Sequence, residues 1–245
     1  MNREKIVNYF KNFPKWAVVF IIIGAFCLLG TGSSMAMLFV GLVLIGLGVL
    51  GIVSFNKKKV TDQEFDSILA DDLKTLSKTA LSKTGTDSSE LVSEEVVITG
   101  PKFWDIAGAE IHYKKGKDNF LRFTPMSVTV INFTQNQLLS YSCVFDLITG
   151  KPLNEATEEY FYKDVVSVST KTESMTITSK DTKIGTLQMN AAEKFTLTTS
   201  GGTSVSVVLS DPSLIEKMGG GEIPKTIAEK AIQTVRKMLR DKKGS

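Results

Sequence analysis

Residues 53–65 read VSFNKKKVTDQEF and join the most apolar part of the chain to its polar part. Lys57, Lys58 and Lys59 end the apolar stretch, and Thr61 opens a pattern typical of a helix start. Lysines directly after an apolar stretch indicate the cytoplasmic boundary of a membrane span, where anionic lipids attract them. This junction therefore predicts a membrane anchor followed by a polar domain on the cytoplasmic side.

The apolar stretch is too long for one membrane span. Residues 16–56 contain no charged side chain, although charged residues make up 22% of the 245 residues. One helix over residues 16–55 would be about 60 Å long, about twice the hydrocarbon core of a bilayer. The small residues GTGSS at 30–34 favour a turn. We therefore expect a helical hairpin with spans at about 16–30 and 35–55.

Basic residues on both flanks orient this hairpin. The connecting loop carries no charge, and the residues that precede the first span are Arg3, Lys5, Lys11 and Lys15. The positive-inside rule then predicts a multi-pass protein of the cell (inner or plasma) membrane, with both termini and the polar domain in the cytoplasm. The alternative is a cleaved signal peptide ending at Ser34, Met35 and Ala36. Both interpretations leave the chain after Lys59 in the cytoplasm.

Glycines mark one side of the second apolar segment. At 100° per residue, Gly41, Gly48 and Gly51 fall on one face, which lets another helix approach closely in lipid. This face either packs against Gly24 within the hairpin or associates with a second protomer. Neither span contains an ionisable side chain, which argues against a transporter or a proton path.

An amphipathic helix is predicted directly after the lysines. Thr61 and Glu64 have the spacing of a capping box, with Val60 available as a staple residue, and Gly85 ends the helical pattern. The helix either packs on the domain that follows or pairs between protomers beneath the membrane. With an acidic linker, it forms the segment 60–94, between the hairpin at 1–59 and a domain at 95–245.

The domain at 95–245 has the pattern of an antiparallel β protein with a terminal helix. Short runs rich in Val, Ile, Thr, Tyr and Phe alternate with turn residues from 96 to 209. They predict an antiparallel sandwich or partly open barrel. The last segment carries an apolar stripe that would cover the open end or one face of the sheet, at Ile227, Ala231, Ile232, Val235, Met238 and Leu239. The fold class predicted is α+β.

Two stretches of this domain resemble bacterial pleckstrin-homology domains. They are FLRFTPMSVTVINF at 120–133 and EEYFYKDVVSVST at 158–170. The resemblance implies about seven antiparallel strands closed by a carboxy-terminal helix, in proteins that are often tethered to a membrane. VTDQEFDSIL at 60–69 is similar to SHOCT-type oligomerisation segments.

The sequence offers little that points to catalysis. His112 is the only histidine, and Cys27 and Cys143 are the only cysteines. Cys27 lies in the apolar stretch and Cys143 in the polar domain, so they suggest neither a disulfide nor a metal cluster. GGGEIPKT at 219–226 lacks the spacing of a phosphate-binding loop. We therefore expect no enzymatic activity, cofactor, metal or small-molecule substrate. A net charge of +3 is too small to indicate nucleic-acid binding.

Basic residues cluster at one hairpin turn. Lys114, Lys115, Lys117 and Arg122 lie where pleckstrin-homology domains that bind inositol phosphates place basic residues. With Lys57, Lys58 and Lys59, they are the candidate contacts to anionic lipid. The main hypothesis is a membrane-anchored cytoplasmic interaction or scaffold module that binds a protein partner or its own copies. The alternative is a sensor of anionic lipid headgroups, and an enzyme without a recognisable motif is a distant third.

Overall fold

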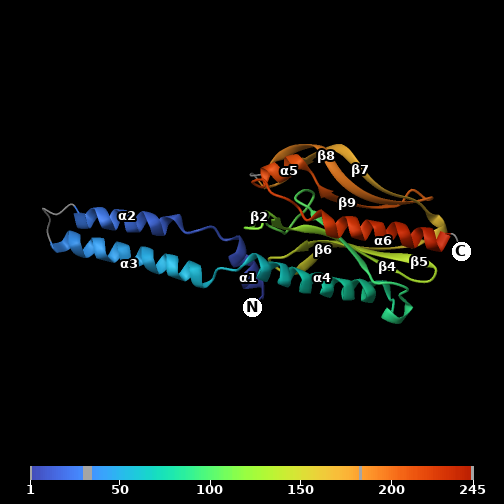
Figure 1. Ribbon diagram of the computed structural model, residues 1–245, viewed down its shortest axis with the longest axis horizontal. Helices are drawn as coiled ribbons and strands as arrows, with labels where there is room; N and C mark the ends of the chain where they lie inside the picture. The colour runs from blue at the N-terminus through green and yellow to red at the C-terminus, as the bar shows by residue number, and fades with distance from the viewer. Residues whose placement is uncertain (1, 30–34, 182–183, 244–245) are drawn as a thin grey trace. The chain divides into compact units, whose positions relative to one another are not determined.

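The computed structural model describes residues 2–29, 35–181 and 184–243 (Figure 1). The protein is a mixed α+β chain with antiparallel sheets, and it divides into two compact units between Phe65 and Asp66. The helices of the N-terminal unit are α1 (Asn2–Phe10), α2 (Lys15–Leu29) and α3 (Met35–Lys57). Helix α4 (Asp62–Thr84) begins in this unit and continues into the C-terminal unit.

Helices α2 and α3 pack against each other with their backbones in close contact. A Cβ atom added at Gly24 would lie 2.7 Å from the carbonyl oxygen of Gly41, and one added at Gly48 would lie 2.5 Å from that of Ala17. Gly51 lies against the Trp16 ring in the same way. The glycine face of α3 is therefore occupied by α2 of the same chain.

The two apolar helices differ in length. Helix α3, with 23 residues, is long and apolar enough to cross a membrane. Helix α2 has 15 residues, about 22 Å, which is less than the roughly 30 Å of the hydrocarbon core. It meets the same length criterion only together with α1, from which it is bent by 56°. The predicted turn at 30–34, including Ser34 of the possible cleavage site, lies outside the described residues.

Within the N-terminal unit, α1 is bound to the start of α4. The Tyr9 hydroxyl donates a hydrogen bond to Asp62 Oδ1 at 2.8 Å, and the rings of Tyr9 and Phe65 are 4.5 Å apart between centroids. Lys5 Nζ lies 3.3 Å from Glu64 Oε1. These contacts bring together the segments that precede α2 and follow α3.

The predicted start of α4 is confirmed. The Thr61 backbone N–H donates to Glu64 Oε2 at 3.0 Å, and the Glu64 backbone N–H donates to Thr61 Oγ1 at 3.2 Å, which is a capping box. Val60 is buried, as expected of a staple residue. Gly85 follows the helix with a φ of +64°, the left-handed conformation typical of a helix end.

The described residues of the C-terminal unit form three antiparallel sheets. The four-stranded sheet has the order β1-β4-β5-β6, formed by β1 (Val96–Pro101), β4 (Met126–Phe133), β5 (Gln137–Asp146) and β6 (Lys151–Phe161). The three-stranded sheet contains β7 (Val165–Thr178), β8 (Thr186–Thr199) and β9 (Ser204–Ser210). A separate hairpin consists of β2 (His112–Lys115) and β3 (Leu121–Thr124). The described strands form no closed barrel.

The short helices mark two differences from the sequence interpretation. The segment at 159–170, a single run in the sequence pattern, is divided by η2 (Tyr162–Asp164), where the chain passes from one sheet to the next. The Tyr162 hydroxyl is anchored there on the Thr134 carbonyl oxygen at 2.8 Å. The acidic linker contains η1 (Ser88–Glu90), and its Val92 N–H donates to the Phe133 carbonyl oxygen at 2.9 Å.

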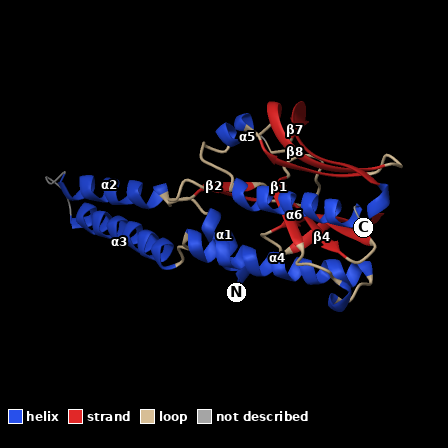
Figure 2. Cartoon of the chain, turned by 45° about the vertical axis from the view of Figure 1, so that its right-hand side comes forward, coloured by secondary structure: helices blue, strands red, loops and turns tan. Residues whose placement is uncertain are grey.

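Helix α6 (Lys225–Lys243) lies between the two larger sheets (Figure 2). Its residues Ile232, Val235 and Leu239 are buried in one core with side chains from both sheets, among them Phe133 and Phe195. The predicted apolar stripe is therefore confirmed at these three positions. The side chains of Ile227 and Ala231 lie outside those that are described. A shorter helix, α5 (Pro212–Lys217), connects β9 to this region.

Helix α4 lies along the other face of the four-stranded sheet (Figures 1 and 2). This face is apolar as well, with Val128 and Val130 fully buried, and α4 buries Leu76 and Ala80. Of the two roles considered for this helix, packing on its own chain is therefore observed for its part in the C-terminal unit.

A close approach between the two sheets at Gly100 predicts a position that accepts no side chain. A Cβ atom at Gly100 in β1 would clash with the Val208 carbonyl oxygen in β9. We expect Gly100→Ala to destabilise the C-terminal unit by roughly 1–3 kcal/mol or more, because backbone must move. Gly201→Ala is the control, since its Cβ would meet only Thr199 Oγ1 at 3.9 Å. Urea unfolding followed by Trp104 fluorescence in a Trp16→Phe background measures both, and equal stabilities would contradict the prediction.

Candidate functional site

The face of the four-stranded sheet that packs on α6, its inner face, changes from apolar to polar along the strands. In β4, Ile131 and Phe133 belong to the core beneath α6, while Ser127 and Thr129 continue the same face. Ser142 in β5 is directly opposite Thr129 and extends the polar half. Helix α6 covers the apolar half, so that the polar half is left to form one wall of a cleft.

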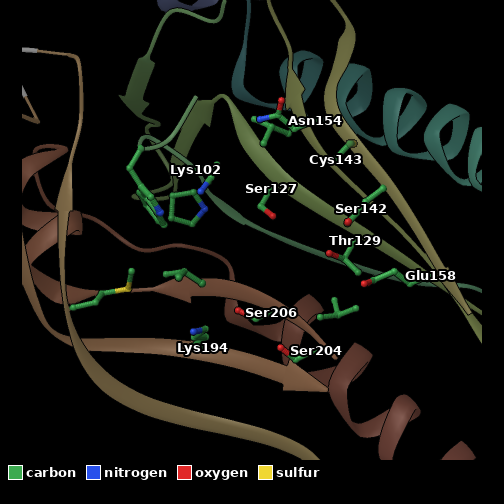
Figure 3. Close-up of a pocket in the computed structure, with 17 residues that line it drawn as sticks. Lys102, Ser127, Thr129, Ser142, Cys143, Asn154, Glu158, Lys194, Ser204 and Ser206 are labelled. Atoms are coloured by element: carbon green, nitrogen blue, oxygen red, sulfur yellow. The ribbon is translucent and has the colours of Figure 1, made fainter. Parts of the chain in front are cut away.

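This inter-sheet cleft has a volume of about 450 Å³ and is open to solvent (Figure 3). The hydroxyls of Ser127, Thr129 and Ser142 lie on one side, and Ser204 and Ser206 of β9 lie on the other (Figure 3). The remaining polar or charged side chains that line it are Lys102, Asn154, Glu158 and Lys194.

Lys102 is held at the end of the cleft that follows β1. Its Nζ lies 4.9 Å from the centroid of the Trp104 ring and 3.9 Å from Asp105 Oδ2. Burial lowers the pKa of Lys102, and the Asp105 carboxylate partly opposes this effect. The stacking on Trp104 fixes this ammonium at the mouth of the cleft.

Two further groups decide what chemistry the cleft supports. Lys194 is paired with Glu173 at 2.9 Å and so contributes a neutralised charge. Cys143 lines the cleft only from within its strand, because it is directly opposite Val128 and its thiol therefore lies on the face of the sheet covered by α4. Burial raises the pKa of this thiol to about 11, so that it is protonated at neutral pH. The lining is thus dominated by neutral hydroxyls and suits hydrogen bonding to a polar ligand.

The residues weighed for catalysis from the sequence lie elsewhere. His112 is in β2, with its Nε2 3.4 Å from Glu110 Oε2, and it does not line the cleft. Within residues 2–29, 35–181 and 184–243, no group of three or more His, Cys, Asp or Glu side chains is arranged to hold a metal ion.

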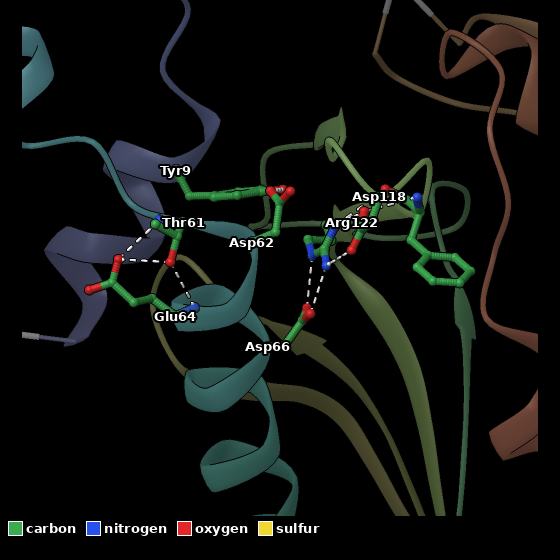
Figure 4. A network of polar contacts seen from close by, with 8 residues as sticks. Tyr9, Thr61, Asp62, Glu64, Asp66, Asp118 and Arg122 are labelled. Atoms are coloured by element: carbon green, nitrogen blue, oxygen red, sulfur yellow. Dashed lines mark hydrogen bonds and ion pairs between the residues drawn. The ribbon is translucent and has the colours of Figure 1, made fainter.

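Arg122 is the centre of an ion-pair network in the C-terminal unit (Figure 4). Its Nε and Nη2 donate to the two carboxylate oxygens of Asp66 at 2.8 and 2.6 Å. Its Nη1 and Nη2 donate to those of Asp118 at 3.0 and 2.7 Å. Two bidentate pairs therefore bind the β2–β3 turn to α4.

The network changes the interpretation of the basic turn. We expected Arg122 among the lipid-contacting residues, but its side chain is only 6% exposed and is bonded to two carboxylates. Lys115 and Lys117 are exposed and Lys114 is half-buried. Lys57, Lys58 and Lys59 are exposed at the end of α3. The lysines thus stay candidates for lipid contact, whereas Arg122 serves to hold the turn.

Gly221 and Glu222 of GGGEIPKT lie against the same hairpin. Gly219, Gly220 and Gly221 all have positive φ, and a Cβ at Gly221 would lie 2.7 Å from the Asn119 carbonyl oxygen. Glu222 exchanges backbone hydrogen bonds with the hairpin, donating to Asn119 at 3.0 Å and accepting from Leu121 at 2.7 Å. This stretch therefore has a structural role at the turn.

Sequence reasoning missed the inter-sheet cleft. The pattern that could have indicated it is the run SVTVINF at 127–133, in which one face reads Ser, Thr, Ile, Phe. A face that is half polar and half apolar indicates that only half of it is covered. The other wall, from β9, depends on a crossing of two sheets that no local pattern encodes.

Searches for similar proteins add no family to this geometry. No protein-family model, no curated protein and no solved structure matches the chain.

The Arg122 network predicts a defined acid sensitivity. The Arg122 guanidinium lowers the pKa of Asp118 from 3.8 to about 2. A lowered folded-state pKa contributes stability above the unfolded value and loses it as the pH falls toward the folded value. We expect Asp118→Asn to cost about 1 kcal/mol at pH 7, a small value because the pair is screened by solvent. This difference should shrink between about pH 4 and pH 2 in urea unfolding.

The control for this prediction is Asp71→Asn on the exposed side of α4. Its difference from the unmodified chain should not follow the same pH window. A pH-independent effect of Asp118→Asn would show that the carboxylate charge does not stabilise the turn.

Proposed function

We propose that this chain is a membrane-anchored interaction module of the cytoplasmic face of the cell membrane. In this proposal α2 and α3 form a two-span hairpin, and the C-terminal unit is a pleckstrin-homology-like domain that binds a protein partner or a second copy. The observation that carries the proposal is the distribution of exposed apolar side chains. Among the side chains that the structure describes, all but four of the large exposed hydrophobic residues lie between Phe13 and Val53.

A bilayer explains this exposure better than water does. Contiguous apolar surface of this kind is rare on soluble proteins, and α2 and α3 bury almost only their mutual glycine face. The short α2 is compatible with a span if lysines at its end extend to the interface and the bilayer thins locally. Lys15 and Trp16 stand at that end.

The N-terminal unit also favours a hairpin over a single span. The hydrogen bond from Tyr9 to Asp62 and the ion pair from Lys5 to Glu64 join the two segments that flank the apolar helices. Both flanks are basic, as the positive-inside rule requires of cytoplasmic segments. A hairpin satisfies both observations, because it returns the chain to the side from which it started.

The strand order supports a pleckstrin-homology-like architecture. A four-stranded antiparallel sheet is followed in the chain by a three-stranded one and then by a carboxy-terminal helix packed between them, with the β2–β3 hairpin as an addition. Such domains present clefts and strand edges to partners. Here the inter-sheet cleft and the outer strands are the surfaces available.

The hairpin proposal predicts which positions a membrane-impermeant thiol reagent reaches. In a background of Cys27→Ser and Cys143→Ala, Met35→Cys should be labelled from outside intact cells. Asn8→Cys and Lys58→Cys should be labelled only after permeabilisation. Asn8 lies in the last turn of α1, Met35 is the first residue of α3, and Lys58 directly follows α3.

A single span through α3 would give a different pattern. Asn8→Cys and Met35→Cys would then share one side, opposite Lys58→Cys. Release of the full chain from membranes by alkaline carbonate would contradict anchorage altogether.

A second candidate function is the sensing of anionic headgroups by the β2–β3 turn. The exposed Lys115 and Lys117 favour it, and each basic residue near an anionic surface contributes on the order of 1 kcal/mol. In nanodiscs containing the full chain, anionic lipid should protect the backbone amides of this turn from hydrogen exchange. High salt, or the triple change Lys114→Glu, Lys115→Glu and Lys117→Glu, should remove the protection. Equal exchange in neutral and anionic nanodiscs would contradict lipid sensing.

A further inference from the structure

Strand β7 is an outer strand with an uncovered surface. Among the described strands its only ladder partner is β8. Lys171, Thr172, Glu173 and Ser174 are consecutive and all exposed, so that neither face of the strand is covered there. The outer edge of such a strand presents backbone N–H and C=O groups to any further strand.

The backbone of β7 is regular over this part. At the register shift between Glu173 and Met175, one β7 residue faces two β8 residues, so the extra residue is in β8. The extra residue at the other shift is Val166 in β7 itself, at the start of the strand. From Ser167 to the end of β7 the edge is therefore free of bulges, which are a common means of preventing strand pairing.

The charges along β7 are self-complementary about Thr172. If two copies pair antiparallel with Thr172 opposite Thr172, Lys171 of each copy faces Glu173 of the other. The same symmetry holds just beyond the strand ends, where Lys163 corresponds to Asp181 and Asp164 to Lys180. Every charged residue from 163 to 181 is thus matched with an opposite charge.

The neighbouring strand adds a reason for Lys171 to take a partner. Directly opposite Lys171 in β8 stands another lysine, Lys194, whose ammonium is paired with Glu173. Like charges directly opposite each other in a sheet are destabilising. A second copy would place its Glu173 on the other side of Lys171 and compensate this repulsion.

We propose that β7 is a homodimer interface, at which two copies of this chain join their three-stranded sheets into one six-stranded antiparallel sheet about a twofold axis at Thr172. The partner is a second copy rather than another protein, because the edge is complementary to itself. The proposal deepens the interaction role proposed above and rests on it only for the choice of a protein partner.

The other long outer strand, β6, does not share this property. It carries one lysine and three glutamates, Lys151, Glu155, Glu158 and Glu159, whereas Lys171 and Glu173 balance in β7. Two β6 strands would bring excess negative charge together. Glu155 is also engaged within its own chain, by the Tyr141 hydroxyl at 2.8 Å and by Lys83 at 3.4 Å.

Disulfide cross-linking of the full chain in its membranes tests the register. Residues directly opposite in an antiparallel pair have Cα atoms about 4.5–5.5 Å apart, within the range of a disulfide. In the Cys27→Ser, Cys143→Ala background, Thr172→Cys should form a covalent dimer under mild oxidation. Ser174→Cys, in the same exposed stretch, would be offset from its counterpart by four residues, roughly 13 Å, and should not.

Thr157→Cys on β6 is a second control and should stay monomeric. Equal cross-linking at 172, 174 and 157 would indicate random collision, and no cross-link at 172 would exclude the interface. Either result overturns the proposal.

Charge reversal tests the chemistry independently of cysteine. Lys171→Glu and Glu173→Lys each place two pairs of like charges across the axis, and each should weaken dimerisation in detergent by roughly tenfold. The double reversal restores opposite charges and should recover dimerisation to within about threefold of the unmodified chain. A double variant as weak as the single ones would overturn the proposal.

The tests of the β7 interface can fail or succeed independently of the tests of membrane anchorage. Cross-linking and dimerisation are read in membranes or detergent whether or not α2 crosses the bilayer. A chain that passes the topology test but fails at Thr172 keeps its anchor and loses only this interface. A chain that cross-links at Thr172 but is released by carbonate keeps the interface and loses the anchor.

Discussion

The contact on which the C-terminal unit depends is the burial of α6 between two sheets that do not close into a barrel. Ile232, Val235 and Leu239 share a core with both sheets, and fully burying each such side chain contributes about 1.5–3 kcal/mol. The residues of α6 described as buried lie between Ile232 and Leu239, over the apolar half of the face of the four-stranded sheet. The rest of that face carries Ser127 and Thr129, which line the inter-sheet cleft, and no described residue of α6 lines it.

In the N-terminal unit, by contrast, most apolar side chains of α2 and α3 face outward. Helices α2 and α3 approach so closely at Gly24, Gly41 and Gly48 that backbone meets backbone. In the membrane hairpin proposed above, apolar burial would give no advantage to helix association, and this close packing would hold the two helices together. The same contacts account for the glycines of a helix that has no polar side chain before Ser54, and they make the glycine face unavailable to a second protomer.

The sequence predicted the elements that depend on local pattern. Thr61 and Glu64 indicated the start of α4, Gly85 indicated its end, and the apolar stripe from Ile227 to Leu239 indicated the helix that packs on the sheets. Alternation of apolar residues gave most strands, but it could not show that η2 interrupts 159–170, because Tyr162 is apolar enough to continue a strand pattern. The hydroxyls of β4 were visible in the sequence, yet their meaning depends on where α6 stops and where β9 crosses Gly100. Those are properties of packing between segments far apart in the chain.

Arg122 shows most clearly why a cluster of like charges in a sequence is not yet a binding surface. Beside Lys114, Lys115 and Lys117 it looks like one member of a basic turn, but one of its carboxylate partners, Asp66, lies 56 residues earlier in the chain. A planar guanidinium binds each of the two carboxylates through a pair of N–H groups, a bidentate geometry that a lysine ammonium lacks. Within this single turn, the buried Arg122 therefore holds the structure together, whereas Lys115 and Lys117 are exposed to solvent. The same distinction applies to β7, because Lys171 and Glu173 can face a second copy only if the sheet order places their strand at an edge. In both places the sequence shows which side chains are charged, and the fold determines which partner each charge can reach.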